Sequence, residues 1–330
     1  MPIFDWLFKR QSKPGVSCVT LPANDAVPSR TSPRSEFIEI PSRRFFGEAV
    51  RSTNGRYTLA WRDANSTGTQ GGARKSGRGR YLLLDGKQVI SDGSIARPND
   101  GRVANNGTFI LNDWGLGEGL GGTFVACDRS GQRLITCRFK ANLFNNGLSQ
   151  DGTLAVCQTC NAYDSDDGSK LALFDLTNGK ELGRWIPESG WADSYSFPRP
   201  GVIQLEYTKL GVFCYSWSGE FLDRENWQDA RLTRGDYGSA MGMVEEILKS
   251  DSDVQPAAVL RFFRCLDRIE KSIPMSDSKT RARARKLRGQ CFECEANFEE
   301  ALRCYQEALA LDPRVGAKRR VDQLIKQLQK

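Results

Sequence analysis

The sequence predicts a two-domain protein in which an all-β domain of about four repeated units precedes a small all-α domain. The chain has 330 residues, more than a single domain usually contains. From residue 36 to about 232, short runs of β-branched and aromatic residues alternate with glycine-containing turns. From about residue 238 to the end, apolar residues recur every three to four positions, which is typical of helices.

The composition limits the possible classes of function. Hydrophobic residues make up 39% of the chain and charged residues 26%, which is ordinary for a protein that folds in water. The formal net charge of +7 permits nucleic-acid contact without arguing for it. The chain has no histidine, which excludes nucleophile systems that need a histidine base and zinc sites that need histidine ligands. We therefore expect a protein that is not an enzyme and binds no metal or cofactor.

The sequence also bears on the cellular compartment. No apolar run approaches the roughly 20 residues that span a bilayer, so we expect no transmembrane helix. The opening MPIFDWLFKR is too short for a secretory signal. The ten cysteines are scattered, which is typical of reduced thiols. These features predict a cytoplasmic protein, and the short apolar opening favours a bacterial origin.

Residues 1–35 are expected to form a short apolar patch followed by a flexible linker. The patch contains Phe4, Trp6, Leu7 and Phe8, and the linker is rich in Pro, Ser and Asn without an apolar period. Three interpretations of the patch remain open: a helix docked on the protein's own core, a motif that binds a protein partner, and a weak membrane anchor. We name these four side chains as candidate partner-binding residues.

The β region, residues 36–232, contains an internal repeat of two alternating halves. Clear examples are LSQDGTLAVCQTC for the first half and LALFDLTNGKELGRW for the second. Each half joins two apolar runs through a glycine turn, which predicts a β-hairpin because such turns need positive φ. The turn glycines of the first half are Gly55, Gly107, Gly152 and Gly201, and those of the second are Gly86, Gly131, Gly179 and Gly219.

Four short strands every roughly 40–50 residues are the pattern of a β-propeller blade. The region resembles the propeller families with WD-like or quinoprotein-like blades, without the Trp-Asp and Gly-His signatures of true WD repeats. The resemblance implies about four blades and a broad face that binds macromolecules. An open array of blades is the alternative. The segment EFIEI, residues 36–40, is the candidate strand for closing the ring by completing the last blade.

The C-terminal region, residues 238–330, is expected to contain five helices. The third and fourth carry the motif GQCFECEANFEEALRCYQEALALDP, which resembles a tetratricopeptide-type (TPR) repeat. The positions that carry the resemblance are Gly289, Phe292, Ala301, Tyr305, Ala308 and Pro313. Arg285 and Arg288 stand where the repeat has Trp and Leu. The resemblance implies a groove for a peptide or helix, with Arg285, Arg288, Phe292 and Tyr305 as candidate partner-binding residues.

Two Cys-x-x-Cys pairs are the candidates for metal or redox chemistry. Cys157 is expected on a strand, where alternation points Cys160 to the opposite face, and Cys291 and Cys294 lie within a repeat helix. We therefore expect neither pair to bind zinc.

Two loops resemble ligand-binding motifs. The glycine-rich run at 115–122 has the spacing of a nucleotide loop, but a strand follows it where that motif requires a helix. The aspartates Asp164, Asp166 and Asp167 lack the spacing of a calcium-binding loop. We expect a hairpin loop and a polar turn.

Basic clusters are the candidates for contact with phosphates. Arg74, Lys75, Arg78 and Arg80 lie in a glycine-rich stretch, and further clusters lie at 281–288 and 318–320. Solvated surface is the alternative interpretation.

The first functional hypothesis is a non-enzymatic adaptor or scaffold subunit of a bacterial multiprotein complex, because both folded parts resemble modules that bind proteins. The first alternative is an accessory subunit that contacts nucleic acid through its basic loops. The second is a propeller enzyme that works through carboxylates. Protein partners are expected under the first hypothesis.

Overall fold

A computed structural model describes residues 36–65, 71–117, 119–250 and 254–329. The apolar patch of Phe4, Trp6, Leu7 and Phe8 lies outside these residues. Within the described chain, one compact unit ends at Arg224 and a second begins at Glu225. The two units are described separately below.

The first unit consists of four antiparallel sheets built as propeller-like blades, which confirms the predicted fold class. The first sheet holds β1 (Glu36–Ile40), β2 (Phe45–Arg51), β3 (Tyr57–Arg62), β4 (Gly79–Asp85) and β5 (Gln88–Ile95), with the 3-10 turn η1 (Pro41–Arg43) after β1. The second holds β6 (Pro98–Val103), β7 (Phe109–Asp113), β8 (Gly122–Cys127) and β9 (Arg133–Phe139). The third holds β10 (Leu143–Leu148), β11 (Leu154–Thr159), β12 (Leu171–Asp175) and β13 (Lys180–Trp185). The fourth holds β14 (Ser194–Arg199), β15 (Val202–Tyr207) and β16 (Gly211–Ser216).

The turn chemistry explains why these hairpins form where they do. All eight predicted turn glycines adopt positive φ, between +57° and +89°. Seven of the eight predicted half-units are complete hairpins in the described structure. The eighth is reduced, because β16 is followed only by an isolated bridge between Tyr215 and Phe221. The fourth sheet therefore has three strands where the second and third have four.

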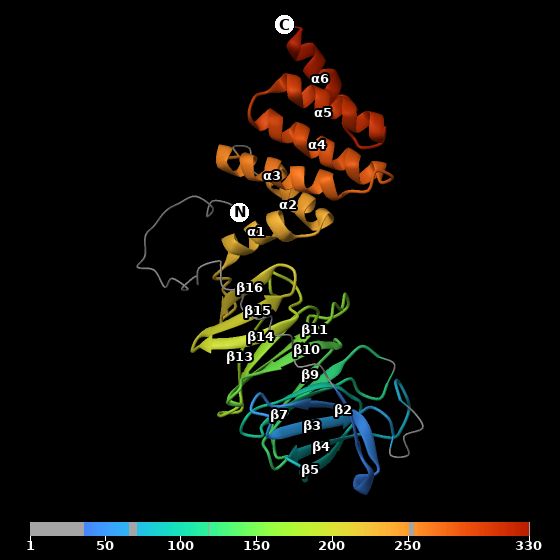
Figure 1. Ribbon diagram of the computed structural model, residues 1–330, viewed down its shortest axis with the longest axis vertical. Coiled ribbons are helices and arrows are strands. Elements are labelled where there is room, and N and C mark those ends of the chain that lie inside the picture. The colour runs from blue at the N-terminus through green and yellow to red at the C-terminus, as the bar shows by residue number, and fades with distance from the viewer. Residues whose placement is uncertain (1–35, 66–70, 118, 251–253, 330) are drawn as a thin grey trace. The chain divides into compact units, whose positions relative to one another are not determined.

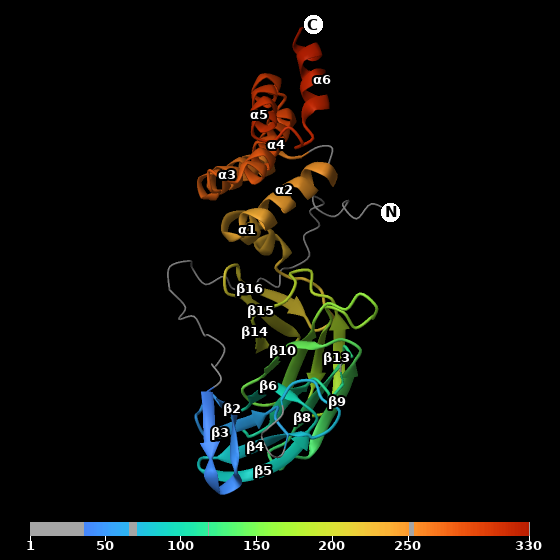
Figure 2. The same ribbon diagram turned by 90° about the vertical axis from the view of Figure 1, so that its right-hand side faces the viewer.

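The sheets pack face to face in chain order. Leu59, Leu83 and Phe109 are fully buried in the cluster between the first and second sheets. Phe124 and Phe174 stack between the second and third sheets with ring centroids 5.0 Å apart. Each of these faces is continuous because strand side chains alternate between the two sides of a sheet. Figures 1 and 2 show the first sheet, in blue to blue-green, and the fourth, in yellow, at opposite ends of this series.

The series of sheets does not close into a ring through β1, which corrects the sequence-based expectation. β1 pairs with β2 in the first sheet, with Ile38 opposite Gly47, and does not complete the last blade. Among the described strands, β3 packs on β6 and β10 packs on β7 and β14, whereas no packing of comparable extent joins the fourth sheet to the first.

A polar ladder on the fourth sheet explains why the series ends there. The hydroxyl of Tyr195 donates to Gln158 of the third sheet over 2.8 Å, so that face of β14 meets the third sheet. Alternation puts Ser194 and Ser196 on the opposite face, where they donate to Glu206 over 2.6 Å and to Gln204 over 2.9 Å. A face of hydrogen-bonded polar side chains gains little from packing against another sheet.

Turn side chains also join neighbouring sheets. The Oδ1 atom of Asn105, in the turn between β6 and β7, accepts hydrogen bonds from the Thr53 hydroxyl and the Asn54 amide, each over 2.9 Å. Both donors lie in the turn between β2 and β3.

We expect Asn105→Ala to lower the free energy of unfolding by about 1 kcal/mol, since two exposed hydrogen bonds are lost. Urea denaturation measures this change. Asn161→Ala is the control, because Asn161 is exposed and makes no hydrogen bond within the described residues; equal destabilisation by the two variants would contradict the prediction.

The second unit is helical. Its helices are α1 (Arg224–Arg234), α2 (Tyr237–Ser250), α3 (Pro256–Ser272), α4 (Ser278–Cys294), α5 (Phe298–Leu311) and α6 (Lys318–Leu328). The described chain thus contains six helices where the sequence predicts five. The additional helix α1 lies at the end of the predicted β region. The sequence did not indicate it, because its buried residues, Trp227, Ala230 and Leu232, form too short a pattern. Among the described residues, no helix is both long and apolar enough to cross a membrane.

Local capping sets the limits of the repeat-like helix pair. Asp277 caps α4 by accepting a hydrogen bond from the Thr280 amide over 3.0 Å. Asn297 caps α5 in the same way through the Glu300 amide, over 3.3 Å. Ala296 turns the chain between the helices with a φ of +54°. The turn between the two helices of the motif therefore lies at residues 295–297.

Candidate partner-binding site

Small residues allow α4 and α5 to cross closely. A Cβ atom added at Gly289 would lie 2.8–3.0 Å from three ring atoms of Tyr305. Ala301 and Ala308 on α5 are fully buried at the same crossing. Tyr305 itself is only 2% exposed, so most of its ring belongs to the core of this helix pair.

Phe292 also serves the packing of the helices. Its ring is partly buried and lies 4.7 Å from that of Phe263 on α3, measured between centroids. This contact ties α4 to the helix before it.

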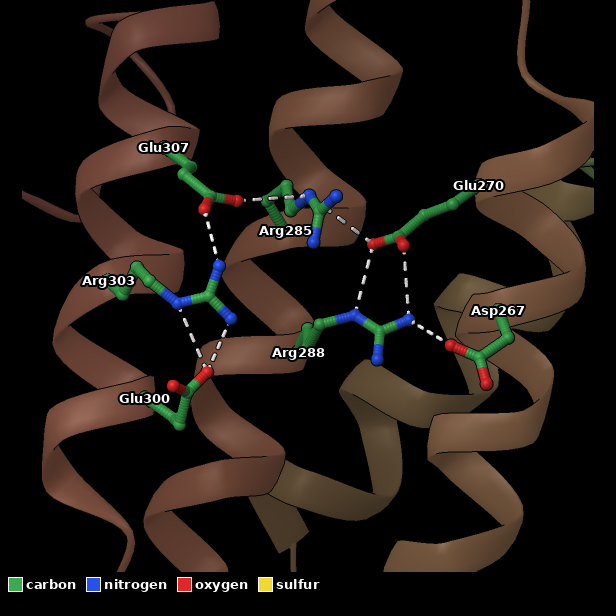
Figure 3. Close-up of polar contacts among 7 residues, drawn as sticks. All are labelled: Asp267, Glu270, Arg285, Arg288, Glu300, Arg303 and Glu307. Carbon is green, nitrogen blue, oxygen red and sulfur yellow. Dashed lines mark hydrogen bonds and ion pairs between the residues drawn. The ribbon is translucent and has the colours of Figure 1, made fainter.

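The two arginines that depart from the repeat pattern enter a charge network across three helices. Figure 3 shows Arg285 and Arg288 on the middle helix α4, between carboxylates of α3 and carboxylates of α5. Arg288 donates to both oxygens of Glu270, over 3.2 and 3.1 Å, and to Asp267 over 2.5 Å. Arg285 lies 3.7 Å from Glu270 and 3.4 Å from Glu307.

These contacts change the interpretation of both arginines. The Arg288 side chain is only 13% exposed, so little of it remains for a partner. Arg303 extends the network on α5 through Glu300 and Glu307. Ion pairs therefore fill the positions where the repeat pattern has apolar contacts between neighbouring helices.

A hollow of about 300 Å³ lies on another side of the same helices. It is lined by Lys286, Gln290 and Glu293 of α4, Tyr305 of α5, and Gly316, Ala317 and Arg320 at and before the start of α6. Arg320 donates to both carboxylate oxygens of Glu293, over 2.8 and 2.9 Å from Nε, which joins α6 to α4. Lys286 donates one hydrogen bond, to the carbonyl of Val315 over 3.2 Å.

One of the residues that line the hollow carries a buried hydrogen-bond acceptor without a partner within the described structure. The side-chain Oε1 of Gln290 is buried and has no hydrogen-bond partner within the described structure. Burial raises the pKa of Tyr305, and the neighbouring carboxylate of Glu293 raises it further, so its phenol stays neutral. The lining residues thus include Gln290, with its buried acceptor, and Lys286, with unused ammonium donors, beside the paired charges of Arg320 and Glu293.

The sequence analysis singled out Tyr305 and, within the basic clusters, Lys286 and Arg320, but it did not group them with Gln290 and Glu293, although a signal was present. Lys286, Gln290 and Glu293 follow one another at intervals of four and three residues, which places them on one face of α4. Arg285 and Arg288 were named instead because they occupy positions of the motif that resembles a tetratricopeptide-type repeat.

The predicted phosphate-binding loop uses half of its basic residues internally. The Arg74 side chain is 5% exposed and pairs with Asp63 over 2.7 Å, and it also donates to four backbone carbonyls, those of Asp63, Gly72, Gly77 and Ala96. Arg80 pairs with Asp92 and donates to the Arg43 carbonyl over 2.9 Å. Lys75 is exposed, and Arg78 donates only to the Ser94 carbonyl, over 3.2 Å. The loop therefore offers two basic side chains, Lys75 and Arg78, for contact with phosphates.

In each Cys-x-x-Cys pair, burial disfavours the thiolate form of one cysteine. Cys157 and Cys291 are fully buried, and burial raises the pKa of Cys291 to about 12. A thiol with a raised pKa is a poor metal ligand, since the thiolate is the binding form. Within the ranges that the structure describes, no three Cys, Asp or Glu side chains gather as metal ligands.

Comparison with known proteins adds similarity of fold. No family model matches the chain, and no curated protein matches it either. Solved structures that resemble it include the C-terminal WD40 domain of Sif2, with 11% identity and a TM-score of 0.30 over 52% of this chain and 42% of that chain. Another is BamB from Moraxella catarrhalis, with 8% identity and a TM-score of 0.34 over 57% of this chain and 50% of that chain. The chain thus covers half or less of each of these chains.

Proposed function

We propose that this protein is a non-enzymatic adaptor whose helical unit holds a segment of a partner protein in the hollow between α4, α5 and α6. In this proposal α4 and α5 form a tetratricopeptide-type repeat, and α2 with α3 supplies the preceding pair that such a repeat needs for stability. The observation that carries the proposal is the buried, unpartnered Oε1 of Gln290 beside the partly used donors of Lys286.

A polypeptide segment fits the chemistry of the hollow. A backbone amide supplies the N–H donor that Gln290 lacks, and a backbone carbonyl or a side-chain carboxylate accepts from Lys286. An unsatisfied buried acceptor costs about 1–3 kcal/mol, so a ligand that pairs with it recovers that energy on binding. The Arg320–Glu293 pair holds α6 against α4 and so keeps the wall of the hollow in place.

Comparative capture from native cells tests the proposal. Immobilised full-length protein is compared with Gln290→Trp, which fills the hollow, and with Lys286→Glu, which reverses its charge. We expect a partner that the wild type recovers reproducibly to fall about tenfold or more with either variant, since a charge-assisted contact is worth about 1.5–3 kcal/mol.

A matched control separates the hollow from general changes of charge. Lys326 is exposed on α6 and does not line the hollow, so Lys326→Glu should leave recovery unchanged. Recovery of the same proteins in the same amounts by all variants would refute the hollow as a binding site. Failure of the wild type to recover any protein reproducibly would refute the adaptor function.

A further inference from the structure

Three large aromatic side chains are exposed near one end of the third sheet. Phe144 at the start of β10 is 45% exposed, Trp191 before β14 is 43% exposed, and Tyr163 after β11 is 94% exposed. All three lie on or beside the connections 140–142, 160–170 and 186–193, which meet at the same end of this sheet because its strands are antiparallel. Exposed aromatic side chains gathered at one end of a domain indicate a binding surface.

The aromatic pair is held in a fixed geometry. The rings of Phe144 and Trp191 lie 6.1 Å apart between centroids, at 44° to one another. The indole N–H of Trp191 donates to the carbonyl of Thr159 over 2.9 Å. The next residue, Ala192, is tied on both sides: its carbonyl accepts from Asn145 over 2.6 Å and its amide donates to Gln158 over 3.1 Å. Such a preorganised pair loses little conformational entropy when it binds.

Two carboxylates lie on the same connection as Tyr163. Asp164 and Asp166 are exposed, and neither forms an ion pair with any residue that the structure describes. Their neighbour Asp167 differs, because it accepts from the Lys140 amide over 2.7 Å and pairs with Arg184 over 3.2 Å. The charge that this connection presents to a ligand is therefore carried by Asp164 and Asp166, with Lys140 and Lys170 as the cations nearby in sequence.

From this arrangement we propose that Phe144, Tyr163, Asp164, Asp166 and Trp191 form an aromatic–acidic surface that binds an arginine- or lysine-bearing segment of a partner protein. A cation gains from the face of an aromatic ring and from a nearby carboxylate at the same time. The third sheet has a local precedent, since the Arg184 guanidinium lies 4.7 Å from the centroid of the Phe139 ring. Phosphate-rich ligands such as nucleic acids and anionic membranes are repelled by the two aspartates.

This surface goes beyond the proposed function, because it lies in the β unit and is independent of the hollow between the helices. A failure at one site leaves the other standing. An adaptor with both surfaces would join a segment held by the helices to a basic segment held by the third sheet.

Fluorescence anisotropy with a labelled peptide of alternating arginine and glycine tests this surface in the full-length protein. We expect the wild type to bind at low ionic strength, and Phe144→Ala and Trp191→Ala each to weaken binding about fivefold, as loss of a cation–π contact of roughly 1 kcal/mol implies. The double variant Asp164→Asn with Asp166→Asn should weaken binding and flatten its salt dependence.

The control variants replace the same kinds of side chain at positions outside the aromatic–acidic surface. Phe37→Ala removes an aromatic side chain that is 69% exposed on β1, and Asp322→Asn removes an exposed carboxylate on α6; both should bind as the wild type does. Phe144→Ala leaves the hydrogen bond from the Trp191 indole to Thr159 in place. Weaker binding by this variant therefore does not result from the loss of that bond. The proposal is overturned if the wild type does not bind the peptide, if the surface variants bind it as tightly as the controls, or if a glutamate–glycine peptide or single-stranded DNA binds equally well.

Discussion

Gly289→Val is expected to lower the free energy of unfolding of the helical unit by about 3 kcal/mol, because the new side chain overpacks the crossing of α4 and α5. Its Cβ alone would lie 2.8 Å from a ring carbon of Tyr305. That ring is buried and is itself packed in the core of α5 and α6, so it has little room to move away. Chemical denaturation followed by the helical circular dichroism signal measures the change.

Gly242→Val provides a matched control within the same unit. Gly242 lies in α2, and a Cβ atom added there meets no atom within 4 Å. Valine has a somewhat higher helix propensity than glycine, so this variant should be neutral or slightly more stable. If both variants changed stability equally, the loss at position 289 would reflect β-branching in a helix and not the close approach of two helices.

The hairpins of the β unit could be predicted from the sequence because their turns are local. A turn that needs positive φ selects glycine, and the residues before it, such as Asn54 and Asp151, bond to the backbone of the same turn. The residues that determine each hairpin therefore lie within about a dozen positions of one another in the sequence. The helix pair α4–α5 was predictable for a similar reason, since Asp277, Asn297 and the small residues at the crossing act over one or two helical turns.

The way in which the sheets end was not predictable in the same way. The alternating pattern of residues 36–40 suits any open sheet edge, so the sequence does not say whether this strand joins the first sheet or the last. The polar ladder was visible in principle, because Ser194 and Ser196 alternate with Tyr195, as Gln204 and Glu206 do with Leu205. Its meaning depends on which face meets the third sheet, and the hydrogen bond from Tyr195 to Gln158 shows that.

The side-chain contacts of the candidate site were not predictable from the sequence either. Arg285 and Arg288 were candidate partner-binding residues because of their positions in the motif that resembles a tetratricopeptide-type repeat. Their acidic partners lie on other helices, with Asp267 and Glu270 separated from Arg288 by 21 and 18 residues in sequence. Pairing between side chains at such separations follows from tertiary packing and leaves no mark in the local sequence. The aromatic–acidic surface was missed for the same reason, because its members are distributed over three connections.

Arg288→Glu is expected to lower the free energy of unfolding by about 2–3 kcal/mol. The variant removes the hydrogen bonds to Glu270 and Asp267 and places a third carboxylate beside them. Breaking a fully buried ion pair costs about 3–5 kcal/mol, and the estimate here is lower because Glu270 is 21% exposed and Asp267 is 56% exposed. Thermal denaturation monitored at neutral pH provides the measurement.

Two further variants decide whether charge or shape causes this loss. Arg288→Met keeps an apolar side chain of similar length where the repeat pattern has Leu, and Glu270 retains Arg285 at 3.7 Å, so this variant should lose less than Arg288→Glu. Arg303→Glu reverses a charge of the same network at a side chain that is 58% exposed, where solvent screens the change, so its melting temperature should fall much less. If Arg288→Met proved as unstable as Arg288→Glu, the network would be essential to the packing of α4. If it matched the wild type, the ion pairs would be a replaceable substitute for apolar contact, and the repeat-like geometry would rest on the small residues at the crossing of α4 and α5.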